Sequence, residues 1–331
     1  MQTNSHGAAG PRLTAGRIVQ KYGILMALLL ACLVLSLISG NFLTGRNVLN
    51  VLRQTSINGV LAIGMTFVIL TRGIDLSVGS VVALAGVVAA SFATTSSSGF
   101  IPGAPWPAVL ALAIGIAVGM GCGAVSGVIV SRFKVPAFVA TLGMLSAARG
   151  LTLLYSGGRP VPGLSGGFRW IGTGDVLGIP VPILVLLAVF AGAWFVLSQT
   201  RFGRQVYAVG GNPHAAKVSG LPVNRIRLLV YVISGGLAGL AGMILAARTG
   251  SALPQAGVAY ELDAIAAVVI GGTSLAGGVG RVTGTLVGAL LIGVMNNGLD
   301  LMGVESYYQQ VIKGVLIVAA VMLDQSRNKQ D

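Results

Sequence analysis

Asp75 is the first candidate for chemistry in this 331-residue chain, because a charged group there stands among glycine and hydroxyl residues. It lies in Thr71–Ser80, TRGIDLSVGS, just before a new apolar run, and Ser77 and Ser80 follow it. Asp75 fits an N-cap of the next helix or a partner for Arg72. It also fits the start of a half-helix whose N–H groups and hydroxyls line a polar path.

A second candidate group is the segment Tyr260–Asp263, YELD, which enters the apolar run Ala264–Ile270. Glu261 and Asp263 are expected at the outer mouth of a membrane span. There they either cap the helix or mark the entrance of a pathway.

A third group consists of Asn296, Asn297 and Asp300, which lie late in another apolar run. Amides are costly in lipid and should face other helices or a cavity. They either form helix-to-helix hydrogen bonds or line a route for a neutral polyhydroxy solute, which amides and hydroxyls suit better than charges do.

These groups favour passage of a solute over bond-making chemistry. The candidate pathway residues are Asp75, Ser77, Asn296 and Asn297. A proton- or sodium-driven carrier usually needs ionisable groups near mid-membrane, and Asp75 is the one serious candidate. The energy source is therefore expected outside this chain.

Motifs of enzymes are missing from the sequence. No Gly-Lys dipeptide occurs, so the chain has no GxxxxGK[ST] loop with which to bind ATP. HExxH is absent too, and the two histidines, His6 and His214, lie outside the apolar runs. We expect no metal and no cofactor on this chain. The glycine-rich segment Gly271–Gly280 is predicted to be a broken helix or a tight turn.

Composition indicates an integral membrane protein. Hydrophobic residues make up 54% of the chain and charged residues 9%, against about 25% charged in soluble domains. The net charge of +13 does not indicate nucleic-acid binding, since the basic residues sit at the ends of apolar segments, where they contact lipid headgroups.

The apolar runs predict an all-α membrane protein with about ten spans and both termini in the cytoplasm. The expected spans are 22–41, 56–72, 79–95, 107–130, 136–155, 180–199, 228–247, 262–276, 282–301 and 307–324. This arrangement puts fourteen basic residues on the inner side and six on the outer side, as the positive-inside rule requires. The expected domains are a cytoplasmic segment 1–21, a transmembrane domain 22–324 and a cytoplasmic tail 325–331.

The longest polar interruption is 200–227, which holds five basic residues and no acidic one. A basic loop between two spans is expected on the cytoplasmic side, and it is long enough to hold a short helix that another protein could grip.

Two further patterns concern packing. Gly115, Gly119, Gly123 and Gly127 repeat every four residues, and Gly235/Gly239 and Gly284/Gly288 repeat this spacing. Such stripes let helices pack closely, and packing within the chain is favoured over packing between subunits. Residues 46–53, RNVLNVLR, fit either a short interfacial helix or an early start of the second span.

Taken together, several segments resemble the ribose-type sugar permease family of binding-protein-dependent ABC importers. The matching segments are ILTRGIDLSVGS (69–80), ATLGML with RG (140–150), RFGRQVYAVGGNPHAAKVSG (201–220), YELDAIAAVVIGGTSLAGG (260–278) and NNGLDLMGV (296–304). They occur in the same order, and the similarity runs from about residue 40 to 324.

The resemblance implies a permease in a bacterial inner membrane that pairs with a second copy, with a cytoplasmic ATPase carrying two nucleotide sites and with a periplasmic sugar-binding protein. ATP and magnesium would bind to the ATPase. It also implies an ATPase-coupling helix, here formed by Asn212, Pro213, His214, Ala215, Ala216, Lys217, Ser219 and Gly220. Asn212 suits an N-cap, Pro213 a first helical turn and Gly220 a helix end. His214 departs from the acidic or polar residue expected at its position.

The expected function is thus the permease subunit of an ATP-driven importer of ribose. Another pentose, a hexose or a furanose-like signalling molecule stays open as the solute, and a stand-alone secondary sugar carrier is the alternative class. The outer basic residues Arg159, Arg169 and Arg248 are expected to meet acidic patches of the binding protein.

Overall fold

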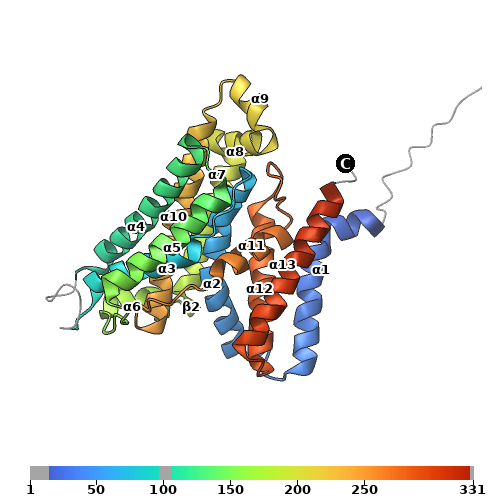
Figure 1. Cartoon of the computed structure of the whole chain (residues 1–331). Helices are drawn as coiled ribbons and strands as arrows, with labels where there is room; N and C mark the ends of the chain where they lie inside the picture. Colours follow the sequence, from blue (N-terminus) through green and yellow to red (C-terminus); the bar gives the residue numbers. More distant parts are fainter. Residues whose placement is uncertain (1–14, 97–105, 329–331) are drawn as a thin grey trace, which may run out of the picture.

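The structure is a computed structural model that describes residues 15–96 and 106–328, and these residues form a helical bundle (Figure 1). The expected terminal segments 1–21 and 325–331 fall partly outside the described residues, at 1–14 and 329–331. The helices are α1 (Ala15–Ile38), α2 (Gly45–Leu70), α3 (Val78–Ala93), α4 (Ala108–Arg132), α5 (Ala137–Ser156), α6 (Gly166–Thr173), α7 (Val181–Gln199), α8 (Arg201–Gly211), α9 (Pro213–Val218), α10 (Val223–Thr249), α11 (Tyr260–Ile270), α12 (Val282–Leu301) and α13 (Ser306–Asn328). Two short antiparallel strands, β1 (Asp175–Val176) and β2 (Ile179–Pro180), form a hairpin before α7.

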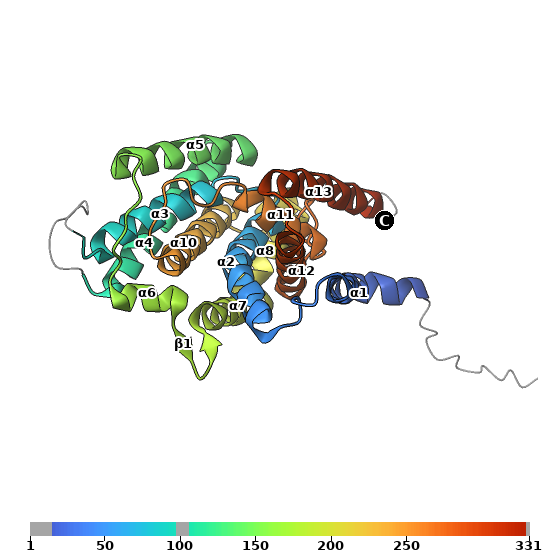
Figure 2. The same ribbon diagram turned by 90° about the horizontal axis from the view of Figure 1, so that it is seen from below.

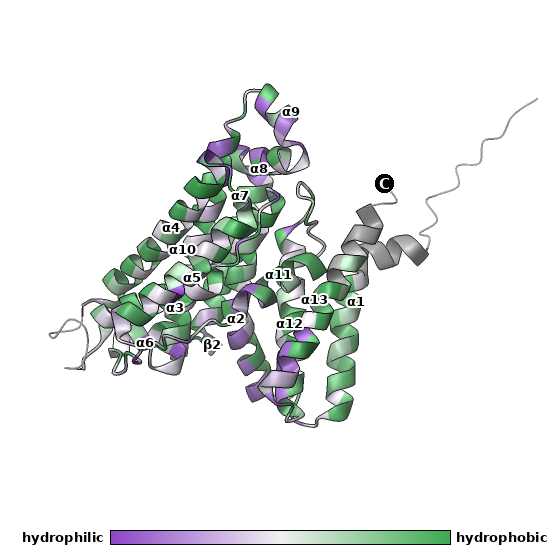
Figure 3. Cartoon of the chain, in the orientation of Figure 1, coloured by the Kyte–Doolittle hydropathy of each residue, from purple (hydrophilic) through white to green (hydrophobic). Residues whose placement is uncertain are grey.

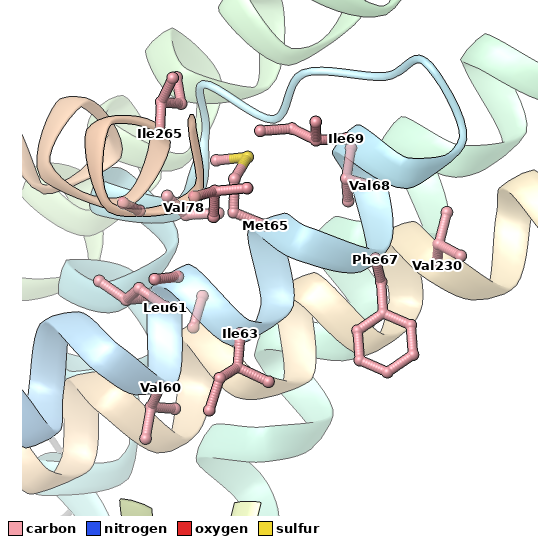
Figure 4. Packing of buried hydrophobic residues seen from close by; sticks show 14 of the residues in the cluster. Val60, Leu61, Ile63, Met65, Phe67, Val68, Ile69, Val78, Val230 and Ile265 are labelled. Carbon is pink, nitrogen blue, oxygen red and sulfur yellow. The ribbon is translucent and has the colours of Figure 1, made fainter. Parts of the chain in front are cut away.

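Helix α2 lies at the centre of the bundle and packs against α7, α10, α11 and α12 (Figure 2). From Thr55 to Leu70 every residue of α2 is buried, which only a helix surrounded on all sides can achieve. Figure 4 shows side chains such as Met65 of α2 packed beside Val78 of α3 and Ile265 of α11. The hydrophobic core is therefore built around α2.

Close packing of α4 on α10 confirms the prediction from the glycine stripe. A Cβ atom built on Gly119 would overlap the carbonyl oxygen of Gly235, and one built on Gly235 would overlap the carbonyl oxygen of Gly119. A Cβ atom built on Gly239 would overlap the carbonyl oxygen of Gly115, and one built on Gly115 would meet the side chain of Met243 in α10. Only glycine permits two helix backbones to come this close, so the stripe serves packing within the chain. Gly284 and Gly288 likewise face α11, near Gly271 and Ala267 respectively.

Helices α1 and α13 are attached at the side of the bundle, α1 mainly through α12 and α13 mainly through α11. Their remaining faces carry exposed apolar side chains such as Leu37 and Val311, as lipid-facing helices do. Figure 3 shows the same apolar character along the long helices, with polar residues gathered at α8 and α9 and at the far end of α2.

Each of the ten predicted spans falls on a helix, and α4, α5, α7, α10 and α12 are long and apolar enough to cross a membrane. Helix α2 is continuous from Gly45, so its early start is confirmed and a separate interfacial helix at 46–53 is wrong. The eighth span was predicted to end at 276, but α11 ends at Ile270. Gly271–Gly280 forms a turn in which Gly272, Gly277 and Gly278 adopt positive φ angles, which end a helix.

Candidate functional site

The basic interruption at 200–227 forms two short helices, α8 and α9, at one end of the bundle, where the start of α1 and the end of α13 also lie (Figure 1). Asn212 caps α9 by accepting hydrogen bonds from the backbone N–H groups of His214 and Ala215, both at 3.0 Å. Pro213 occupies the first turn and Gly220 has a φ of 81° just after the helix. These local predictions for α9 are confirmed.

Helix α9 presents most of its residues to its surroundings. His214, Ala215, Lys217, Ser219 and Gly220 are exposed, whereas Ala216 is buried against the bundle. Beside α9 an open groove of about 630 Å³ separates it from the start of α10 and from the turn between α4 and α5. The groove is lined by four basic residues, which are Lys134, Lys217, Arg225 and Arg227. An acidic surface would complement it.

Asp75 lies in the turn between α2 and α3 and is buried, with 1% of its surface exposed. One carboxylate oxygen accepts hydrogen bonds from the backbone N–H of Ser77 at 3.1 Å and from its hydroxyl at 2.6 Å. The other accepts from the hydroxyl of Ser234 in α10 at 3.0 Å. Asp75 thus ties the start of α3 to the middle of α10. Arg72 is not its partner, because the Arg72 side chain binds the end of α8 instead.

The four pathway candidates do not form one cluster. Asn297 forms a reciprocal amide pair with Asn47 of α2, with both hydrogen bonds at 2.9 Å. Asn296 faces Asp263 instead, and its side-chain amide donates to that carboxylate at 3.4 Å. Asp75 and Ser77 have neither asparagine among their hydrogen-bond partners. Hydrogen bonding between α12 and α2 therefore explains why an asparagine is found at position 297.

A polar seam runs between α2 and α12. We use this name for the facing residues Asn47, Thr55, Asn58, Thr66, Thr285, Asn296 and Asn297. The Thr66 and Thr285 hydroxyls lie 2.8 Å apart. Among the described residues, Thr55 Oγ1 and Asn296 Oδ1 are buried without a hydrogen-bond partner. Thr55 Oγ1 lies against the backbone of α12, since a Cβ atom built on Gly293 would overlap it.

An ion pair lies at the edge of this seam. Nζ of Lys313 in α13 is 2.9 Å from Oδ2 of Asp263 in α11. The side-chain amide of Asn58 also donates to Asp263, at 3.4 Å. Asp263 is 3% exposed, so its carboxylate is paired inside the bundle rather than open at its surface. The two charges are tolerated inside the bundle because each offsets part of the cost of removing the other from water.

The opposite end of the bundle carries the remaining predicted site residues. Arg159 and Arg169 are exposed, after α5 and within α6. Arg248, near the end of α10, instead donates to Oδ1 of Asn50 in α2 at 3.2 Å. Glu261 is partly buried beside Gly79 at the start of α3. Of the five, Arg159 and Arg169 are thus free to meet a partner's surface.

A cavity of about 230 Å³ lies between α3, α10 and the segment 250–259. Val82, Leu245 and Tyr260 are among its lining residues, and its walls are mainly apolar. Arg149 of α5 holds the segment in place by donating to the carbonyl oxygens of Pro254 at 2.6 Å and Ala256 at 3.0 Å. The cavity is a place where a small solute could lie within the bundle.

The sequence alone did not single out three residues that hold this part of the bundle together, namely Lys313, Asn58 and Arg149. A lysine inside an apolar run usually has a polar or acidic partner, so Lys313 carried a usable signal, although the sequence does not show that its partner is Asp263. Asn58 and Arg149 carry none, because their roles depend on how distant helices pack. Within the described residues, no group of three His, Cys, Asp or Glu side chains could hold a metal ion.

A helical membrane bundle with buried polar contacts between its helices, and with a capped helix exposed at one end, is consistent with the membrane-spanning subunit of a transport system. A family model described as "Branched-chain amino acid transport system / permease component" matches residues 47–321. The chain belongs to this family of permeases, and within it to the sugar permeases.

The relatives are sugar permeases by name. The chain is 51% identical to the ribose import permease protein RbsC of Escherichia coli K12 over 307 residues, which cover 92% of this chain and 93% of that protein. It is 45% identical to RbsC of Bacillus subtilis 168 over 330 residues, 99% and 100% of the two chains. The D-allose permease protein AlsC of E. coli K12 is 40% identical over 93% of each chain. No solved structure matches the chain.

Proposed function

We propose that this chain is the permease subunit of an ATP-driven, binding-protein-dependent importer of D-ribose in a bacterial inner membrane. The observation that carries the proposal is the identity of 45–51% with ribose import permeases over nearly the whole chain. The polar seam supports it too, because buried amides and hydroxyls without excess charge suit a neutral polyhydroxy solute.

In this proposal the α8–α9 end faces the cytoplasm, where α9 acts as the coupling helix of a partner ATPase. Support comes from its exposed residues and from the basic groove beside it, which suits an acidic partner surface. ATP and magnesium bind to that ATPase, so the permease performs no covalent step. Arg159 and Arg169, at the other end, face the periplasmic sugar-binding protein, and a second copy of the chain completes the pathway.

A different sugar is the second candidate for the solute. Relatives named as permeases for D-allose, L-arabinose and xylose are 40%, 38% and 35% identical to this chain. These names include a hexose and two pentoses, so permeases with similar sequences serve different sugars.

A stand-alone secondary carrier is the alternative class. The observation that favours it is the buried pair of Asp263 and Lys313, since carriers use intramembrane ionisable groups to couple ions to transport. In an ATP-driven importer the same pair serves only to hold α13 against α11.

Uptake of radiolabelled ribose into proteoliposomes separates these possibilities. The chain is reconstituted alone and then with its cognate ATPase and sugar-binding protein. We expect uptake that requires both partners and ATP and that survives a protonophore. Uptake by the chain alone that collapses with the proton gradient would establish a carrier instead. Competition by unlabelled allose, arabinose and xylose then ranks the solutes. If one of these sugars inhibits the uptake of labelled ribose more strongly than unlabelled ribose does, that sugar is the preferred solute instead of ribose.

A further inference from the structure

The turn that follows α2 has an unusual backbone. Arg72 has a φ of 65°, and its N–H donates to the carbonyl oxygen of Ile69 at 2.9 Å. The next N–H, of Gly73, donates to Val68 at 3.0 Å. This is the position where helices usually end on glycine, because a side chain disfavours a left-handed conformation. An arginine there indicates that its side chain contributes something that glycine could not.

The Arg72 side chain holds the end of α8. Its Nε donates to the carbonyl oxygen of Gly210 at 2.6 Å. A second guanidinium nitrogen donates to the carbonyl oxygen of Gly211. Asn212, the cap of α9, comes next in the chain. Two charge-assisted hydrogen bonds from one planar group fix both position and orientation, so the segment that enters α9 cannot move independently of the turn after α2.

The turn between α11 and α12 packs into the same place. The N–H of Gly278 donates to the carbonyl oxygen of Leu70, the last residue of α2, at 3.0 Å. A Cβ atom on Gly210 would overlap that same oxygen, and one on Gly277 would meet Cγ of Arg72 at 2.5 Å. Glycine at Gly210 and Gly277 therefore allows three segments distant in sequence to meet around Arg72.

Tyr207 of α8 adds a second link to this turn. Its hydroxyl donates to the carbonyl oxygen of Gly280 at 2.9 Å. Burial raises the pKa of Tyr207, and Arg281 lowers it by a smaller amount. The phenol thus stays protonated near neutral pH and can donate. With this bond, α8 is attached to the α2–α3 turn through Arg72 and to the α11–α12 turn through Tyr207.

We propose that Arg72 is a positioning residue that passes movement of α8 and α9 to the short helices α3 and α11. The inference rests on the proposed function, in which an ATPase moves α9. Helix α3 begins at Val78, a few residues after Arg72, and α11 ends at Ile270, just before the glycine-rich turn. These helices are 16 and 11 residues long, about 24 and 17 Å at 1.5 Å per residue, so each spans only part of a bilayer core of about 30 Å.

Both short helices bring buried acidic groups next to the rest of the bundle. Asp75 binds α10 just ahead of α3, and Asp263 of α11 binds Lys313 of α13. A shift of α8 that reaches α3 and α11 through Arg72 would therefore act on α10 and α13 as well. This gives a contiguous route from the exposed coupling helix to the interior of the bundle.

The test compares Arg72→Gln and Arg72→Lys with the unchanged chain, each reconstituted with the cognate ATPase and sugar-binding protein. Glutamine removes the guanidinium fork, whereas lysine keeps the charge but cannot bind both carbonyl groups in the same geometry. Arg132→Gln, which alters an exposed arginine at the end of α4, is the control. Three quantities are measured: ATPase subunit bound per permease, ATP hydrolysed, and radiolabelled ribose taken up.

We expect both Arg72 variants to bind normal amounts of ATPase and to hydrolyse ATP. In Arg72→Gln the ATP hydrolysed per ribose rises by on the order of tenfold, with Arg72→Lys between this value and that of the unchanged chain. An unchanged ratio in both variants would overturn the inference, and so would a loss of uptake that only follows a loss of bound ATPase. If the unchanged chain shows no ATP-dependent ribose uptake, the proposed function fails first and the inference with it.

Discussion

Separating the buried ion pair of Lys313 and Asp263 tests how α13 is held in the bundle. Lys313→Met leaves a carboxylate that is 3% exposed, with two amide donors 3.4 Å away. We expect it to lower the free energy of unfolding by about 3 kcal/mol. Asp263→Asn leaves the Lys313 ammonium, whose side chain is 18% exposed and can reach a more polar environment. We therefore expect a smaller loss, about 2 kcal/mol.

The double variant Asp263→Asn/Lys313→Met removes both charges and keeps the volumes nearly unchanged. We expect its stability to lie within about 1 kcal/mol of the unchanged chain, because no unpaired charge remains buried. The measurement is equilibrium unfolding of the purified permease in mixed micelles, followed by the fluorescence of its three tryptophans. Matched controls are Lys134→Met and Asp175→Asn, which neutralise exposed residues and should change stability by less than about 0.5 kcal/mol.

Additive losses of stability in the double variant would refute this reasoning. If the double variant loses about 5 kcal/mol, the sum of the two single losses, the two charges do not stabilise each other. Equal losses in the two single variants would contradict the argument from exposure. Single variants as stable as the controls would show that α13 does not depend on this contact.

Three further expectations concern α9, the α4–α10 contact and the turn at Asp75. Ala215→Glu adds a negative charge to the exposed face of α9 and should weaken ATPase binding about tenfold or more in pull-down assays, while the permease stays inserted in the membrane. Normal ribose uptake by this variant would argue against α9 as the coupling helix. Gly119→Ala forces α4 away from α10 and should cost about 2 kcal/mol in unfolding, whereas Gly121→Ala on the same helix faces open space and should cost nothing. Ser234→Ala removes a donor from buried Asp75 and should cost about 2 kcal/mol, measured in the same way, and an unaffected stability would mean that this hydrogen bond is replaced.

The long helices of the fold were predictable, because runs of apolar residues of membrane-spanning length mark them in the sequence. Apolar runs locate the helices, and the four-residue glycine spacing of Gly115 to Gly127 marked a face that packs within the chain, although it did not show that the partner is α10. The end of α11 was predictable only in part: the glycine-rich segment 271–280 indicated a broken helix or a turn, but the apolar run placed the end of the span at 276 rather than at Ile270. Helix α9 was expected from the family resemblance, and its capping residues, Asn212 and Gly220, agreed with that expectation because caps act locally.

The candidate site was predictable only in part, because its contacts join distant helices. The sequence singled out Asp75 and Asn296 by their cost in lipid, but it did not show which helix satisfies each of them. Asp263 and Lys313 are 50 residues apart, and Arg72 and Gly210 are 138 residues apart. Such pairs follow from the packing of the whole bundle, which no local pattern encodes.

The way α1 is attached has a consequence for how the protein is made. Its main partner is α12, and Leu35 of α1 fits against Gly298. The amide pair that closes this side of the bundle joins Asn47 and Asn297, which are 250 residues apart. At about 5–20 residues per second, a ribosome needs roughly 10–50 s to synthesise the intervening chain. Throughout that interval α1 and the first turn of α2 wait without their partner helix, so α1 takes its final place in the bundle only late in synthesis.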